Sequence, residues 1–176
     1  MGGMKAKKPL KAKKPLRAKQ TLKKGGKKKR NKPDSIPALR KKADALFSRY
    51  VRLRDSEFMD GQWVGDCITC DRKLVVINGD GKWQKSAQWG HFIGRGNHWL
   101  RYSEENGNLQ CTHCNAWRDK ESMLEAYRKA IDDKYGSGVC KRLKKEAKDN
   151  ETFNLKKSDY RQVIEDCNEQ IKFYLT

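Results

Sequence analysis

Four cysteines stand in two close pairs separated by forty residues. Cys67 and Cys70 form the first Cys-x-x-Cys pair, and Cys111 and Cys114 form the second. Four thiolates at this spacing are typical of a tetrahedral structural zinc site, which has no open position and so cannot activate water. The alternative, two redox-active pairs, would need a thioredoxin-like βαβ pattern that the sequence does not show. The cysteines therefore predict a zinc ion that stabilises the fold.

One histidine and one asparagine lie where this zinc site would fix them. Gly90-His91 falls between the two cysteine pairs, and Asn115 follows the last cysteine directly. A neutral imidazole, with an unperturbed pKa of about 6.5, accepts a proton from water near pH 7. The amide oxygen of Asn115 is a hard ligand of the kind that Mg²⁺ prefers. Facing each other, the two side chains would suit phosphodiester hydrolysis; the alternatives are a packed histidine and a helix cap.

The N-terminal segment carries most of the net charge. Residues 1–32 contain fifteen Lys or Arg and no acidic residue, and they repeat Lys-Ala-Lys-Lys-Pro-Leu at 5–10 and 11–16. Of the net charge of +19, about +4 remains for the rest of the chain. Because such a segment has too few apolar residues to offset its chain entropy, we expect residues 1–33 to be a disordered tail. Its expected partner is a polyanion, nucleic acid rather than an anionic membrane.

The remaining composition bounds the class of protein. We expect residues 34–176 to form one domain. No run of about 20 apolar residues is present, so we expect no membrane span. The basic N-terminus lacks the apolar core of a signal peptide, and the paired thiols favour a reducing compartment. These features predict a cytoplasmic protein.

The hydrophobic patterns predict an α+β fold. A first helix begins at Asp34 or Ser35 and ends near Leu53, with its apolar residues on one stripe. The last helix carries Cys167 on its apolar face, so we assign that cysteine to packing. Further helices are expected over 114–134, 139–147 and 158–174.

Short β segments are expected around and between the cysteine pairs. A β-branched run at 74–77, a turn with two glycines and then Trp83 predict a hairpin. Further strands are expected over 87–93 and 108–110. The intervening stretch, 94–107, lacks periodicity and is predicted to be a long loop, of a length that is usually either functional or disordered.

These residues together resemble the HNH nucleases, also called ββα-metal or His-Me finger nucleases. The resemblance rests on a strand with Gly90-His91, a strand with Asn108, and Cys114-Asn115 opening a helix. In that family the histidine is the general base, the middle asparagine orients it through a backbone contact, and the last residue holds a divalent metal. The resemblance implies Mg²⁺ or Mn²⁺ as catalytic ion and the catalytic residues His91, Asn108 and Asn115.

The wider pattern narrows the match to one group of phage proteins. Over about residues 36–174 the chain resembles the lambdoid phage NinG/Rap recombination proteins, and Gln-Cys-x-x-Cys-Asn at 110–115 is the most specific element. The resemblance implies a zinc-stabilised ββα-metal core surrounded by helices. It also implies cutting of branched DNA, such as Holliday junctions and displacement loops, in the host cytoplasm. Other segments that carry it are 52–55, 67–70, 90–95, 101–102 and 134–136.

One position departs from the HNH pattern. Many HNH enzymes have an aspartate just before the histidine as a second metal ligand, whereas this chain has Gly90. Asp119 stands one helical turn after Asn115 and is the candidate carboxylate ligand. The alternative for Asp119 is a solvated charge on the helix.

Basic and aromatic residues near these elements are candidate DNA contacts. Arg95 and Arg101 flank the loop after the histidine and would clamp phosphates bidentately, and Lys120 is a further basic contact. The alternative for each is ordinary surface charge. An exposed tryptophan could stack on an unpaired base, although core packing is expected for at least two of Trp89, Trp99 and Trp117.

The sequence thus predicts a metal-dependent, structure-selective endonuclease that acts on branched DNA. Three alternatives stay open: a non-catalytic zinc-stabilised DNA-binding protein, an HNH nicking endonuclease acting on linear duplex, and an RNA-binding protein. A homodimer is expected by analogy, because resolving a junction needs two symmetric cuts. The C-terminal helix is the candidate interface.

Overall fold

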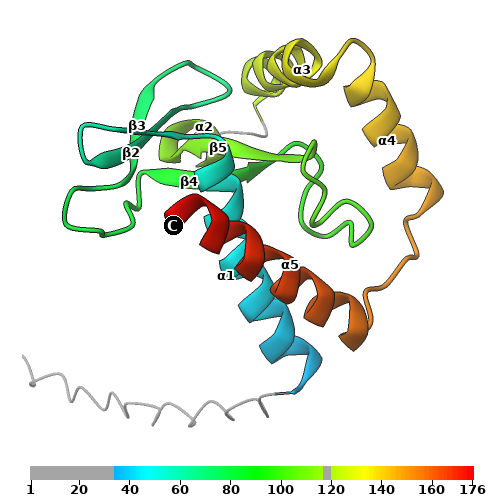
Figure 1. Cartoon of the computed structure of the whole chain (residues 1–176). Helices are drawn as coiled ribbons and strands as arrows, with labels where there is room; N and C mark the ends of the chain where they lie inside the picture. Colours follow the sequence, from blue (N-terminus) through cyan, green and yellow to red (C-terminus); the bar gives the residue numbers. More distant parts are fainter. Residues whose placement is uncertain (1–33, 117–119) are drawn as a thin grey trace, which may run out of the picture. The chain divides into compact units, whose positions relative to one another are not determined.

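The computed structural model describes residues 34–116 and 120–176, so the predicted tail and Asp119 lie outside the described residues (Figure 1). Within these residues, one helix is followed by five strands in two small antiparallel sheets and then by four more helices, and this segregation of strands from helices confirms the predicted α+β class. The elements, in chain order, are α1 (Ile36–Arg54), β1 (Glu57–Met59), β2 (Gln62–Asp66), β3 (Lys73–Ile77), β4 (Ala87–His91), β5 (Gly107–Cys111), α2 (Thr112–Ala116), α3 (Glu121–Tyr135), α4 (Val139–Asp149) and α5 (Lys157–Leu175).

The two longest helices, α1 and α5, pack side by side (Figure 1). Ser35 caps α1, since its Oγ accepts a 3.4 Å hydrogen bond from the backbone N–H of Ala38. Buried apolar residues of both helices, including Leu39 and Tyr160, share one cluster. Cys167 of α5 is 3% exposed and belongs to a second cluster between the helices. The first and last predicted helices and the packing role of Cys167 are confirmed.

The first sheet has the strand order β1-β2-β3 and differs from the predicted hairpin. β3 confirms the strand at 74–77, and its main partner is β2. The predicted turn back to Trp83 is present, because Trp83 makes an antiparallel bridge to Ile77 and the N–H of Gln84 donates to the carbonyl of Val76 at 2.9 Å, but this second arm is too short to form a strand. The missed hairpin, β1–β2, turns at Asp60 and Gly61, which both have positive φ (49° and 77°). Asp-Gly is the residue pair that favours such a two-residue turn, so the signal was present in the sequence.

β4 and β5 form the second sheet, and both strands contact α1 and α2. Their antiparallel register places Ala87 opposite Cys111 and His91 opposite Gly107. All five residues of β5 are buried, including Leu109, because elements cover both faces. α2 follows β5 without a break, so the second cysteine pair spans the junction of a strand and a helix.

The predicted helix over 114–134 is wrong in its extent. The structure has two helices in its place, α2 and α3, and α2 begins earlier than predicted, at Thr112. Gly136, with φ 111°, follows α3 as the glycine stop predicts. Among the described residues, no helix is long and apolar enough to cross a membrane.

Candidate zinc centre and active site

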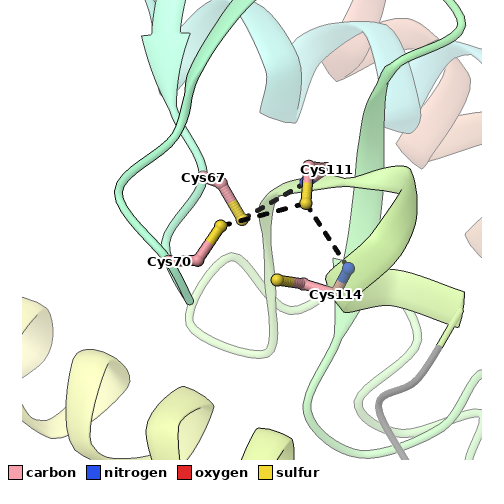
Figure 2. Close-up of side chains that lie close together, drawn as sticks. All are labelled: Cys67, Cys70, Cys111 and Cys114. Carbon is pink, nitrogen blue, oxygen red and sulfur yellow. Dashed lines mark hydrogen bonds between the residues drawn. The ribbon is translucent and has the colours of Figure 1, made fainter.

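The four paired cysteines converge on one point between the two sheets (Figure 2). Their Sγ atoms all lie within 4.8 Å of one another, and those of Cys70 and Cys111 are 3.9 Å apart. A tetrahedral zinc with Zn–S bonds of about 2.3 Å requires sulfur atoms about 3.8 Å apart. The cluster therefore fits a closed, all-thiolate zinc site, as the spacing predicts.

Local backbone structure brings each pair into place. In the first pair, the N–H groups of Cys70 and Asp71 donate to the carbonyl of Cys67, and Asp71 has a positive φ of 53°. In the second pair, the N–H of Cys114 donates to Sγ of Cys111, and the N–H of Cys111 donates to Sγ of Cys67. These contacts tie the turn after β2 to the junction of β5 and α2.

The thiols differ in their electrostatic environment. Burial raises the pKa of Cys67 and, with its neighbouring thiols, that of Cys114. Burial acts in the same direction on Cys111, but the hydrogen bond from the backbone of Cys114 and the neighbouring thiols hold its pKa below the ordinary value. A bound cation would favour the thiolate form of all four.

His91 is the last residue of β4 and is 2% exposed. Its ring packs on the indole of Trp89, with a centroid separation of 4.0 Å. Trp89 packs in turn against the rings of Phe47 in α1 and of Tyr102, with centroid separations of 5.1 and 6.3 Å. The orientation of the candidate base is therefore fixed by aromatic packing against α1.

Asn115 lies in α2 and is anchored to the strand that carries His91. Its Nδ2 donates a 2.7 Å hydrogen bond to Oε1 of Gln88, three positions before His91 in β4. Side chains alternate along a strand, so those of Gln88 and His91 leave opposite faces of β4. The structure thus attaches Asn115 to the same strand as His91 rather than directly to its imidazole.

The two asparagines of β5 and its preceding turn have different partners. Asn108 is fully buried, and its Oδ1 accepts from Tyr135 at 2.8 Å and from Lys134 at 3.0 Å. It therefore joins β5 to the end of α3. Asn106, which was not singled out in the sequence, exchanges hydrogen bonds with the backbone N–H (2.6 Å) and carbonyl (3.0 Å) of Ile93. Asn106 thus holds the backbone two residues after His91, while Nδ2 of Asn108 donates to the backbone carbonyl of Glu105 at 3.2 Å.

Gly90 is a glycine for a steric reason. A Cβ at this position would lie 1.7 Å from Oε1 of Gln110, whose side chain crosses the strand there. Nε2 of Gln110 donates to Oγ1 of Thr69 at 2.7 Å, which links β5 to the first cysteine pair. The space that an aspartate would need is filled by Gln110, so this position offers no metal ligand.

The predicted DNA contacts fall into two groups. Arg101 is buried and forms a two-point ion pair with Asp44 of α1, at 2.9 and 2.6 Å, and it also donates to the carbonyl of Arg95. Its guanidinium is committed to the fold, and we withdraw it as a phosphate clamp. Arg95 and Lys120 are exposed, as a contact to DNA requires.

Among the described residues, the four cysteines are the one group of three or more Cys, His, Asp or Glu placed to hold a metal. For a catalytic ion, the described residues offer Oδ1 of Asn115. Asp119, the predicted second ligand, lies outside the described residues. The described residues therefore supply one oxygen ligand for Mg²⁺ or Mn²⁺, and they do not form a complete metal site.

Comparison with models of protein families shows to which family the chain belongs. The model of the family described as bacteriophage lambda NinG protein matches residues 2–174. The chain belongs to the NinG family. The resemblance that the sequence shows begins at about residue 36. The family match begins at residue 2 and so also includes the basic N-terminal segment of this NinG family member. No curated protein and no solved structure matches the chain.

Proposed function

We propose that this NinG family member is a metal-dependent endonuclease that cuts branched DNA during phage recombination in the host cytoplasm. The observation that carries the proposal is the arrangement of β4, β5 and α2. His91 ends β4, and Asn115 is tied to the same strand through Gln88. This strand–strand–helix order resembles that of the HNH nucleases, and it lies next to a four-cysteine cluster that we assign to structural Zn²⁺.

In the proposed mechanism His91 is the general base. Its imidazole takes a proton from the water that attacks phosphorus, and its packing on Trp89 fixes the direction of that transfer. A divalent ion, Mg²⁺ or Mn²⁺, would supply stabilisation of the charge that develops on the phosphate. Asn115 is the proposed ligand through Oδ1, because its Nδ2 is already occupied by Gln88. Asp119 is proposed as the second ligand.

The surroundings of the site support a nucleic acid substrate. Exposed Arg95 follows His91 by four residues, and Lys120 stands at the N-cap of α3. The lysine-rich segment 1–32 adds affinity that does not depend on sequence, by releasing counterions from DNA. A homodimer is proposed because resolving a junction requires two cuts.

A non-catalytic DNA-binding protein is the second candidate. It is favoured by the side chain of Gln110 in the space beside Gly90, where many HNH enzymes have a metal ligand, and by the opposite faces of β4 from which His91 and Gln88, the anchor of Asn115, extend. Such a protein would bind branched DNA and leave it intact in every metal.

The test compares a labelled four-way junction with a linear duplex and a duplex RNA of equal length. Wild-type protein is incubated with each in Mg²⁺, in Mn²⁺ and in EDTA, and products are separated on denaturing gels. Cutting of the junction alone, abolished by EDTA, is the expected result. Cutting of the linear duplex would indicate a nicking enzyme, and binding without cutting would indicate the second candidate. Preferred binding of RNA would contradict both.

A further inference from the structure

The loop between β4 and β5 is held at three points. Asn106 closes its base on Ile93, and Asn97 donates from Nδ2 to the carbonyl of Ala147 in α4 at 2.9 Å. At the third point, the guanidinium of Arg101 pairs with the carboxylate of Asp44 in α1. The polar side chains of these three residues are thus used to fix the loop rather than to meet solvent.

Two other large side chains of this rigid loop point outward. Trp99 is 45% exposed, and Arg95 is exposed four residues before it. Trp99 packs edge-on against Phe153, which is itself 37% exposed, with a centroid separation of 5.2 Å. An exposed indole held upright by a second ring adds little to the stability of the core. Contact with a ligand that covers the indole would remove its apolar surface from water, which is favourable.

Positive charge lies beside the part of the loop that leads to Trp99. A cavity of about 570 Å³ lies between the loop, at Gly96 and Asn97, and α4, where Lys144 and Lys148 line it together with one acidic residue, Glu151. Lys144 and Lys148 are one helical turn apart, so both ammonium groups stand on the same side of α4. The turn after α4 then leads to Phe153, whose N–H donates to the carbonyl of the helix cap, Asn150.

We propose that Trp99, supported by Phe153, stacks on an unpaired base of DNA while Lys144 and Lys148 contact the adjacent phosphates. A ring face beside a basic groove suits a single-stranded segment, because every base offers a π-face and every nucleotide a phosphate. In a continuous duplex the bases are already stacked on one another, so the indole gains little. The surface therefore distinguishes DNA with unpaired bases, as at a branch point, from linear duplex. This inference rests on the proposed function, which supplies DNA as the ligand.

The experiment measures binding in EDTA, where no cutting occurs. The probes are a duplex with a three-nucleotide bulge that carries 2-aminopurine and a fully paired duplex of the same length. Trp99→Ala should weaken binding of the bulged probe by about 5- to 100-fold and that of the paired probe by less than about twofold. Trp99→Phe, which keeps a ring, should restore most of the affinity. Phe173→Ala is the matched control, because Phe173 is 76% exposed on α5, away from this loop.

A second readout separates stacking from a general loss of structure. Wild type should quench the 2-aminopurine fluorescence, and Trp99→Ala should not. Lys144→Gln combined with Lys148→Gln should reduce the slope of log affinity against log salt by up to about 1.8. If wild type binds the bulged probe and Trp99→Ala binds it equally well, this inference fails and the proposed function stands. If wild type binds neither probe, both fail.

Discussion

Oε1 of Gln88 accepts a 2.7 Å hydrogen bond from Nδ2 of Asn115, and this contact joins the strand that carries the candidate base to the helix that carries the candidate metal ligand. The bond also determines which atom of the amide is left for a metal, since the nitrogen is occupied and Oδ1 is not used in it. Gln88 is thereby a positioning residue for the proposed reaction.

Gln88→Ala should lower the rate of junction cleavage by about 10-fold, because loss of a side chain that orients a metal ligand typically costs 10- to 100-fold. Binding of the junction in EDTA should not change. Gln88→Glu, which keeps the acceptor oxygen, should restore most of the rate. Gln84→Ala is the control, because Nε2 of Gln84 bonds only locally, to the carbonyl of Lys82. Equal rates for wild type and Gln88→Ala would argue against a role for Asn115.

Zinc should be bound at one ion per chain and should support folding. Cys111→Ser should lose the ion and unfold at much lower denaturant concentration, because a closed zinc site contributes on the order of 10 kcal/mol of apparent binding free energy. Native mass spectrometry and urea unfolding measure the two effects. Cys140→Ser is the matched control, since Cys140 is equally buried but lies outside the cluster. A wild-type protein that folds equally well after chelation would contradict the assignment.

Arg101 and Arg95 should separate stability from DNA binding. Arg101→Ala should lower the free energy of unfolding by about 3 kcal/mol, because it leaves the carboxylate of Asp44 without its ion-pair partner. Arg95→Ala should change stability by less than about 0.5 kcal/mol but reduce the salt dependence of DNA binding by about 0.9 in log–log slope. Urea unfolding and salt titrations of binding check both. The opposite pattern would show that the sequence-based assignment of Arg101 was correct after all.

Asp55 should make stability depend on pH. Burial acts to raise its pKa, but hydrogen bonds and charge from Arg54, with further contributions from Lys134, hold the pKa below its usual value. A carboxyl with a lower pKa in the folded state stabilises the fold above its unfolded pKa, about 3.9, and this contribution is lost as pH falls through the folded pKa. Asp55→Asn should therefore cost about 3 kcal/mol at pH 7 and progressively less below about pH 4.

Urea unfolding of wild type and Asp55→Asn at a series of pH values measures this difference. Zinc release at low pH affects both proteins, so the difference between them isolates the carboxyl. Glu57→Gln is the control, because Glu57 is exposed on β1. If the difference in free energy of unfolding stays constant down to pH 3, the stabilisation by Asp55 does not depend on the charge of its carboxylate.

The zinc cysteines and the long helices were predictable because their signals are local. Spacing alone identified the cluster, and the capping serine with an apolar stripe located α1. The β1–β2 hairpin was missed although Asp60-Gly61 is a strong turn signal, since its strands are short and only Gly65 in them is buried. Lys120, whose extended backbone angles precede α3, is neither a proline nor a glycine, so the start of a separate helix at Glu121 is not marked in the sequence.

The candidate site was predicted in its residues but not in its contacts. Whether Arg101 meets DNA or Asp44 depends on a partner 57 residues away, which no local pattern reveals. The same holds for Gln110, whose side chain explains Gly90, and for Asn106, which lies two residues from the asparagine that the resemblance selected. Sequence spacing places residues in a motif, and tertiary packing decides what each side chain touches.

The most direct test of the account compares junction cleavage by wild type, His91→Ala and His113→Ala in Mn²⁺. His113 is the control, because it is an exposed histidine within the second cysteine pair. Circular dichroism and zinc content should confirm that all three proteins are folded. We expect His113→Ala to cut at a rate near that of wild type and His91→Ala to bind the junction but cut it at least about 100-fold more slowly. Cleavage by folded His91→Ala at the wild-type rate would contradict the proposal that His91 is the general base.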